Sequence, residues 1–308
     1  MTERSRRVSP ALALLAFGLL SSAARARDPL PGAGADPLEA VARAYRIEVT
    51  TESAFPVRTT YGAIDGKSPD RAARERYVPL FISEFTLYPR ELVTRSKLKR
   101  VVLCAELSFA GQRRNAVPDF EHDTLYLDAE RGAGDRTYLR KVIHHEFFHI
   151  IDYRDDGQLY SDAGWAALNP RDFMYGTGGA NAQTTSTTSV LTSAVPGFLN
   201  HYSTTGVEED KAEVFANMIV DSAYVEERIK TDRVLASKVE RMRALMARFC
   251  PDANESFWTA ARRVDRADAA PGSKADSCAP ESSSCRPACL VDRWRLLRVP
   301  HRRLLRCD

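Results

Sequence analysis

The chain has 308 residues, of which 44% are hydrophobic and 28% are charged, a composition typical of globular proteins and not of collagens, coiled coils or wholly disordered chains. No apolar run approaches the ~20 residues of a membrane-spanning helix, which argues against an integral membrane protein. The net charge of +3 is unevenly distributed, because residues 1–26 carry +3, residues 286–308 carry +5 and the body between them carries −5. This acidic body disfavours a nucleic-acid-binding core.

Residues 1–26 have the pattern of a signal peptide. A basic start, Arg4–Arg7, precedes the apolar stretch Ala11–Leu20, and Ala24-Arg25-Ala26 supplies small residues around a cleavage point. We therefore expect the protein to be secreted or periplasmic. A basic tail followed by a short buried helix is the alternative interpretation.

The six cysteines favour disulfides in an exported protein. Cys104 lies in an apolar run, where an unpaired buried thiol and a bridge to Cys250 are both compatible with the sequence. The four other cysteines lack the CxxC spacing of a structural zinc site, and their pairing is open. They are Cys278, Cys285, Cys289 and Cys307.

Residues 27–70 are expected to form an N-terminal segment and linker. The linker is the Pro-, Gly- and Ala-rich stretch Asp28–Asp36. A short helix over Pro37–Tyr45 and a strand over Tyr45–Thr50 should follow, the strand because its apolar residues alternate and include β-branched side chains.

Residues 71–265 are expected to form one domain. The stretch Ser68–Arg95, which overlaps the start of this domain, has a helical pattern that Pro79 and Pro89 interrupt. Two strands should follow, over Arg100–Leu107 and Thr124–Asp128, joined by a polar segment.

A helix from about Thr137 to Tyr153 comes next, with Asp135 as its N-cap after a turn at Gly132–Asp135. The polar stretch Asp155–Asn200 is long for a loop in a compact domain, and such loops are often functional. Apolar repeats then predict further helices. These cover Val207–Ile229, Thr231–Phe249 and Asn254–Arg263.

Residues 266–308 form a low-complexity, cysteine-containing basic tail. Its interleaved Leu, Trp and Arg residues would suit contact with an anionic surface. A solvated tail without such a contact is the alternative that we favour.

The strongest chemical pattern lies in the helix expected over 137–153. His145 and His149 are four residues apart, so on a helix both imidazoles project from one face and can bind one metal ion. Glu146 is rotated by about 100° from His145, where it can flank the metal and accept a proton from water. The neighbouring positions are apolar, and burying these three polar side chains would be costly without a partner such as a metal. A core helix with incidental His and Glu is the alternative.

A third protein ligand is needed, because catalytic zinc typically keeps three of them and one open position. Glu209 and Glu213 are four apart on a later expected helix and share a face. One of them can bind the metal while the other accepts a hydrogen bond from a ligand imidazole. Glu208 and Asp210 are expected to decorate the start of that helix, where acidic residues are favoured.

The pattern His145-Glu146-x-x-His149 followed by Glu209-x-x-x-Glu213 resembles the gluzincin zinc metallopeptidases. The spacing is most similar to that of the anthrax lethal-factor-like and Pro-Pro endopeptidase branch, in which a Tyr seven residues before the ligand Glu stabilises the oxyanion; here Tyr202 occupies that position. The resemblance covers roughly residues 138–216. The spacing of 60 positions from His149 to Glu209 departs from it and leaves substrate preference open.

The resemblance implies an α+β fold, a zincin-like catalytic domain with a small N-terminal mixed sheet, an HExxH active-site helix and a helical C-terminal half. It implies Zn²⁺ held by His145, His149 and Glu209, with Glu146 as general base and Tyr202 as oxyanion donor. Glu213 would lie behind the ligands, in contact with an imidazole.

Two other families of zinc peptidases take their third ligand from a different place in the sequence. A metzincin would need Gly at position 152 and a ligand at 155, but both are Asp, so this class is rejected. An aspzincin would use Asp172, since Asp172-x-x-Tyr175-Gly176 fits part of its pattern. Asp152 is assigned a supporting role behind the ligands or a structural one.

The resulting functional hypothesis is an exported zinc-dependent metalloendopeptidase that acts on a peptide or protein substrate. An extended peptide could pair with Thr124–Asp128 if that strand forms a sheet edge. The alternatives are a non-catalytic exported zinc-binding protein, a zinc hydrolase of other substrates, and the aspzincin-type peptidase.

Overall fold

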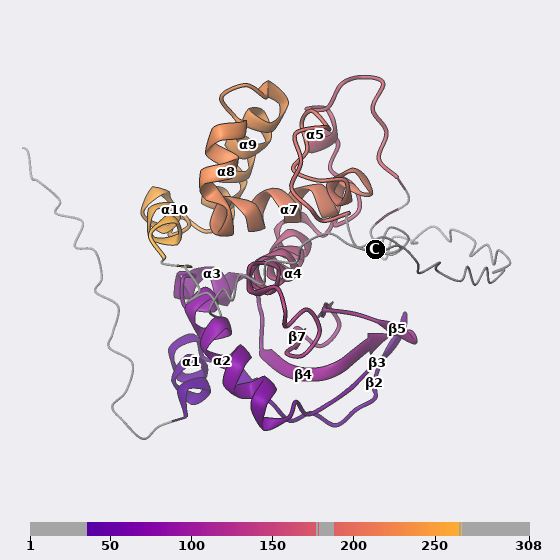
Figure 1. The fold of residues 1–308 in the computed structure, drawn as a ribbon, viewed down its shortest axis with the longest axis vertical. Helices are drawn as coiled ribbons and strands as arrows, with labels where there is room; N and C mark the ends of the chain where they lie inside the picture. The colour runs from indigo at the N-terminus through magenta and orange to yellow at the C-terminus, as the bar shows by residue number, and fades with distance from the viewer. Residues whose placement is uncertain (1–35, 177, 179–187, 265, 267–308) are drawn as a thin grey trace, which may run out of the picture. The chain divides into compact units, whose positions relative to one another are not determined.

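The computed structural model describes residues 36–176, 178, 188–264 and 266 (Figure 1). The expected signal peptide, most of the expected linker and all the tail beyond residue 266 lie outside these residues. The described chain is α+β, as expected, with a mixed sheet and helices on both sides of a long central helix, α4. None of the described helices combines the length and apolarity needed to cross a membrane.

Within the described residues, seven strands form one sheet in which β2, β3, β4, β7 and β6 lie in that order, while β1 and β5 also pair with β4. β4 runs parallel to β1 and β7 and antiparallel to β3 and β5. The strands are β1 (Glu48–Thr50), β2 (Val57–Thr59), β3 (Gly62–Lys67), β4 (Arg100–Phe109), β5 (Gln112–Arg113), β6 (Ala116–Asp119) and β7 (Thr124–Asp128).

The strand over Thr124–Asp128 is present as β7, but the expectation that it forms an edge is wrong. It pairs with β4 on one side and with β6 on the other, and all five of its residues are buried. In the described sheet the outer strand on this side is β6, which contains Pro118. Proline lacks a backbone N–H and is therefore found on outer strands and not in central ones.

The helices before β4 follow the sequence pattern. They are α1 (Pro37–Tyr45), α2 (Arg71–Phe85) and α3 (Arg90–Arg95). Pro79 is tolerated inside α2, and Pro89 is the N-cap of α3. Strands from both sides of residue 71 share one sheet, so the division expected between residues 70 and 71 separates no folded bodies.

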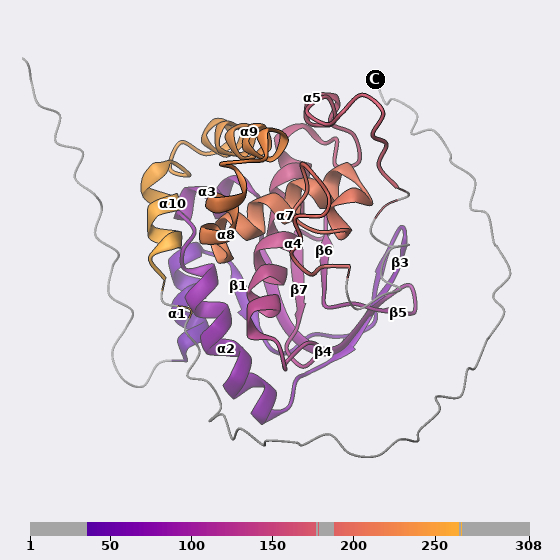
Figure 2. The same ribbon diagram turned by 45° about the horizontal axis from the view of Figure 1, so that its top comes forward.

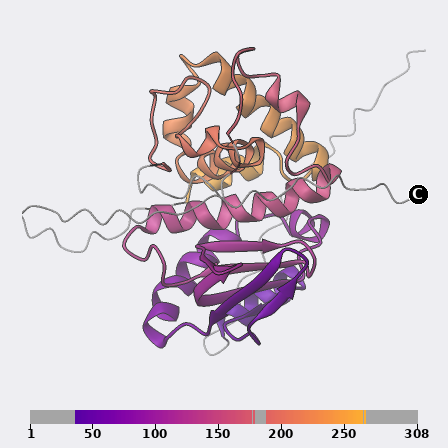
Figure 3. The same ribbon diagram turned by 90° about the vertical axis from the view of Figure 1, so that its right-hand side faces the viewer.

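Helix α4 (Arg136–Asp156) lies between the sheet and the C-terminal helices (Figure 3). It crosses one face of the sheet over β7 and packs along α7 (Figure 2). The later elements are α5 (Ala163–Ala166), the 3₁₀ turn η1 (Tyr202–Thr204), α7 (Val207–Val220), α8 (Ser222–Arg228), α9 (Arg233–Phe249) and α10 (Glu255–Arg262).

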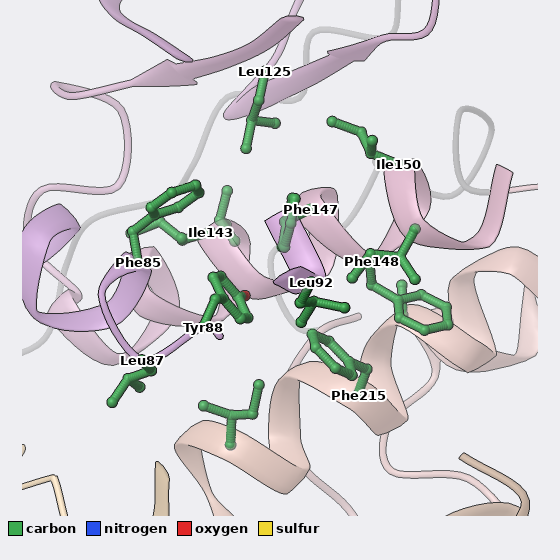
Figure 4. Close-up of a cluster of buried hydrophobic side chains, with 14 of the residues drawn as sticks. Phe85, Leu87, Tyr88, Leu92, Leu125, Ile143, Phe147, Phe148, Ile150 and Phe215 are labelled. Atoms are coloured by element: carbon green, nitrogen blue, oxygen red, sulfur yellow. The ribbon is translucent and has the colours of Figure 1, made fainter. Parts of the chain in front are cut away.

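The core surrounds α4 on two sides (Figure 4). Phe147 faces Phe85 and Tyr88, with ring centroids 5.7 and 4.7 Å away. Phe148 packs against Phe215 of α7 at 5.0 Å. Burying such side chains contributes about 1.5–3 kcal/mol each, so α4 is fixed by the apolar neighbours of its polar motif.

Cys104 in β4 and Cys250 after α9 are both buried and free. The bridge between them that the sequence allowed is therefore wrong, and Cys104 is the unpaired buried thiol of the alternative interpretation. The other four cysteines lie outside the described residues.

Candidate metal centre

Helix α4 presents His145 and His149 on one face, as their spacing predicts. The helix begins where the Asp135 side chain accepts a 2.9 Å hydrogen bond from Tyr138 N, the N-cap role expected for it. It ends at Gly157, whose φ of 74° suits glycine. Both histidines are buried, at 7% exposure each.

His145, His149 and Glu209 converge on one point. Nε2 of His145 lies 2.9 Å from Glu209 Oε2 and 3.1 Å from His149 Nε2, and His149 Nε2 lies 3.5 Å from the same carboxylate oxygen. Each residue offers one ligand atom, and all three atoms lie within 4.8 Å of one another. The structure therefore brings together one residue set expected from the sequence.

The donor set fits zinc. Ligand bonds of about 2.0–2.2 Å in a tetrahedral site separate neighbouring ligand atoms by roughly 3.3–3.6 Å. The observed separation of 3.5 Å lies within this range, and those of 2.9 and 3.1 Å are shorter than it. Nδ1 of His145 lies 3.0 Å from the Glu213 carboxylate, so this ring presents Nε2, and not Nδ1, to the other two candidate ligands.

The pKa values of His145 and Glu209 are shifted by the charged groups around them. Burial alone would lower the pKa of His145, but Glu209 and Glu213 raise that pKa well above its ordinary value. Burial opposes ionisation of Glu209, but hydrogen bonds from His145 and His149 lower its pKa. The cluster thus contains a carboxylate that attracts positive charge.

Glu209 is positioned by the first turn of α7, which is buried from Val207 to Ile219. Gly206 precedes the helix, and a Cβ on it would lie 2.4 Å from a Glu208 carboxylate oxygen. Glycine therefore leaves room for the Glu208 side chain to fold back over the helix start.

Glu213 lies beside the imidazole of His145. One carboxylate oxygen lies 3.0 Å from His145 Nδ1. The other accepts hydrogen bonds of 2.7 Å from Asn200 Nδ2 and 3.1 Å from Asn217 Nδ2. Neither asparagine was singled out from the sequence, because each is recognisable only by its contact with Glu213.

Tyr202 lies beside the cluster in η1. Its ring centroid is 5.9 Å from that of His145. Burial, together with the carboxylates of Glu209 and Glu146, raises the pKa of Tyr202 far above its ordinary value. The phenol is therefore a neutral hydrogen-bond donor at physiological pH.

Glu146 lies next to His145 on α4 and is half-buried, whereas the two histidines are buried. Burial raises the pKa of Glu146, and the neighbouring His145 and His149 oppose that rise. A carboxylate with a raised pKa next to the three candidate metal ligands is suited to accept and return a proton.

Asp152 is not placed behind an imidazole. Its two oxygens lie 2.8 and 2.7 Å from Lys211 Nζ, and both side chains are almost fully buried. Of the two roles considered for Asp152, this contact fits the structural one. His149 Nδ1 is buried and has no hydrogen-bond partner among the described residues.

Asp210 does not decorate the surface, contrary to the expectation from its position at a helix start. Its side chain is fully buried, and its Oδ2 accepts hydrogen bonds from Trp165 Nε1 at 2.8 Å and from the Tyr175 hydroxyl at 2.6 Å. Lys238 Nζ lies 2.8 Å from the same oxygen. The sequence signal that could have shown this is the run of four charges, Glu208 to Lys211, at the start of a helix whose remaining residues are mostly apolar.

His144, which directly precedes the His145–His149 motif on α4, belongs to a different network. Its Nε2 lies 3.0 Å from Glu84 Oε2 in α2, and its Nδ1 contacts the Tyr88 hydroxyl. Arg266 Nη2 lies 2.8 Å from the same Glu84 oxygen. This buried carboxylate was also not anticipated from the sequence.

Asp172, the ligand of the aspzincin alternative, is exposed and does not belong to the cluster that the described residues form. Tyr175 from the same string bonds to Asp210 instead. The arrangement therefore favours Glu209 as the third ligand.

The chain is similar to known proteins over part of its length. A family model with the description putative zinc-binding metallo-peptidase matches residues 118–255, a span that includes His145, His149 and Glu209. A solved structure from Bacteroides caccae ATCC 43185 with the same description is 16% identical, with a TM-score of 0.47, and the match covers 73% of this chain and 88% of that chain. No curated protein matches the chain. Over residues 118–255 the chain is thus similar to a family of zinc-binding metallo-peptidases.

Proposed function

We propose that the protein is a zinc-dependent metallopeptidase of the gluzincin type that hydrolyses internal peptide bonds. The observation that carries the proposal is the convergence of His145 Nε2, His149 Nε2 and Glu209 Oε2 within 4.8 Å. Glu146 and Tyr202 at the border of this cluster make it suited to catalysis and not only to structural binding, since a structural zinc site usually has four protein ligands.

His145, His149 and Glu209 would hold the zinc ion. When bound, zinc supplies Lewis-acid polarisation and lowers the pKa of water towards ~7. Glu213 keeps the His145 imidazole in one orientation and tautomer through Nδ1.

Glu146 is assigned as the general base. It takes a proton from the attacking water and returns it to the amine that leaves when the peptide C–N bond breaks. Tyr202 donates a hydrogen bond from its hydroxyl group to the carbonyl oxygen, which becomes negative as the water adds. The raised pKa values of both groups support these roles.

We propose that an extended substrate binds along β6, the outer strand beside α4. The Asn115 side chain donates a 2.7 Å hydrogen bond to the Tyr138 hydroxyl and so connects the start of β6 to the first turn of α4. Pro118 offers no N–H, so main-chain pairing would be restricted to its neighbours.

Export remains part of the proposal and rests on the basic and apolar pattern of residues 1–26. N-terminal sequencing of the mature protein should find a start after Ala26. A protein recovered with Met1 intact contradicts this part alone.

The proposed function is tested with the purified mature protein and a mixed peptide library. Cleavage should require bound zinc, stop with a chelator and return when zinc is restored. Glu146→Gln should keep stoichiometric zinc and lose about 10²–10⁴-fold in turnover. Stoichiometric zinc without any cleavage by the wild type would support the non-catalytic alternative, and full activity of Glu146→Gln would remove Glu146 from its role.

A further inference from the structure

Asn200 is a fully buried amide between the end of the long loop and α7. Both ends of its side chain are bonded. Nδ2 donates to Glu213 Oε2 at 2.7 Å, while Oδ1 accepts from the Ser203 backbone N–H at 2.9 Å and from the Ser203 hydroxyl at 2.8 Å. The amide therefore joins α7 to the 3₁₀ turn that carries Tyr202.

The orientation of this amide is determined by its neighbours. An ionised Glu213 carboxylate can only accept hydrogen bonds, and the backbone N–H of Ser203 can only donate one. Asparagine supplies a donor and an acceptor at the required ends, whereas aspartate would lack the donor and alanine would lack both. The chemistry of the position therefore selects an amide.

Asn200 is connected through one intervening residue to each of two site residues, His145 and Tyr202. Through Glu213, Asn200 reaches the Nδ1 side of His145, which is 3.0 Å from the other Glu213 oxygen. Through Ser203, it fixes the turn in which Tyr202 lies, and the Tyr202 N–H is itself bonded to Thr188 O at 2.9 Å. The proposed ligand and the proposed oxyanion donor thus depend on one buried residue.

We infer that Asn200 is a positioning residue that holds Tyr202 and the His145 imidazole in a fixed relation to each other. The inference rests on the proposed function for the roles of these two residues. The hydrogen bonds that carry it are independent of that function.

Asn217 is a matched control. It is also a fully buried asparagine, and its Nδ2 donates to Glu213 Oε2 at 3.1 Å and to the Glu213 carbonyl at 2.8 Å. These bonds stay within α7. Removing Asn217 should therefore affect Glu213, but should leave the Tyr202 turn intact.

The first measurement is amide hydrogen exchange of residues 201–205 in the full-length protein, followed by mass spectrometry. Asn200→Ala removes the acceptor of the Ser203 N–H, so exchange of this segment should be about five- to tenfold faster. Asn217→Ala should leave it at the wild-type rate. Wild-type protection in Asn200→Ala, or equal loss in both variants, overturns the inference.

The second measurement compares Tyr202→Phe in three backgrounds. Tyr202→Phe should lower kcat by the same factor in the wild type and in Asn217→Ala. In Asn200→Ala its effect should shrink to about threefold or less, because residues in one network are not additive. A full Tyr202→Phe effect in the Asn200→Ala background contradicts the coupling.

Asn200→Asp is the second variant if Asn200→Ala fails to fold. The aspartate keeps an oxygen for Ser203 and loses the donor to Glu213. It should therefore keep the protection of residues 201–205 while zinc affinity falls about 10–100-fold. Loss of protection, or wild-type zinc affinity, refutes the assignment. A wild type that cleaves no peptide would defeat the proposed function, whereas the exchange result still decides the role of Asn200.

Discussion

Lys238 of α9 reaches Asp210 of α7 through a contact of 2.8 Å between Nζ and Oδ2, and both side chains are fully buried. The same ammonium group donates to Gly197 O at 2.7 Å and lies 3.5 Å from the centroid of the Phe198 ring. Because Asp210 directly follows Glu209, this ion pair fixes the first turn of α7 at the residue next to the candidate ligand.

Lys238→Met should destabilise the fold by about 3–5 kcal/mol, because it leaves the Asp210 carboxylate buried without its cation. The free energy of unfolding is measured by denaturant titration. Lys230→Met is the control, since Lys230 pairs with Glu227 on the surface, and it should unfold at the wild-type midpoint. An unchanged midpoint for Lys238→Met would show that the pair contributes nothing to stability.

Glu84→Gln should make the free energy of unfolding less dependent on pH in the acidic range. Burial opposes ionisation of Glu84, but His144 and Arg266 outweigh it and lower the pKa to about 2. Because the unfolded value is about 4.3, this carboxylate stabilises the fold above about pH 4.3, and its contribution is lost as the pH falls towards 2.

The difference between wild type and Glu84→Gln should therefore be about 3 kcal/mol at pH 7 and should narrow below about pH 4. Unfolding titrations from pH 7 to pH 3 measure it. Glu75→Gln, at an exposed pair with Arg71, serves as the control. A difference that stays constant down to pH 3 contradicts the lowered pKa.

Glu209→Ala should lower the zinc content of the purified protein to well below one equivalent, because it removes one of three converging ligand atoms. Asp172→Ala should leave the zinc content unchanged, since Asp172 is exposed and outside the cluster. Metal analysis after dialysis decides between them. The opposite pattern would restore the aspzincin alternative.

Tyr202→Phe should lower kcat by about 10²–10³-fold with little change in KM, because an oxyanion donor acts mainly in the transition state. Its zinc content should match that of the wild type. Steady-state kinetics with a cleavable peptide measure both constants. A change in KM alone would assign Tyr202 to substrate binding.

The convergence of His145, His149 and Glu209 could be predicted because its signals are local. A spacing of four residues places His145 and His149 on one helical face wherever that helix forms, and the same rule selected Glu209 and Glu213. The helix itself could be expected from its apolar positions and from Asp135 as N-cap.

The missed features depend on partners that are distant in the sequence. The short strands β2, β3, β5 and β6 were not predicted, because their pairing with β4 and β7 defines them more than their own residues do. Asp210 was expected at the surface because Lys238, its partner in α9, cannot be identified from spacing along one helix. For the same reason the sequence favoured the wrong strand as the sheet edge.

Arg266 affects where the chain can be truncated without losing a contact of the folded domain. Its guanidinium contacts the buried Glu84, which in turn holds His144 on the helix of the candidate ligands. A polypeptide shortened to end at residue 265, the limit expected for the domain, would lose one of the cations around that carboxylate. Ending it at residue 266 keeps this cation, so a single residue at the boundary determines whether a truncated protein retains the charge balance around the helix of the candidate ligands.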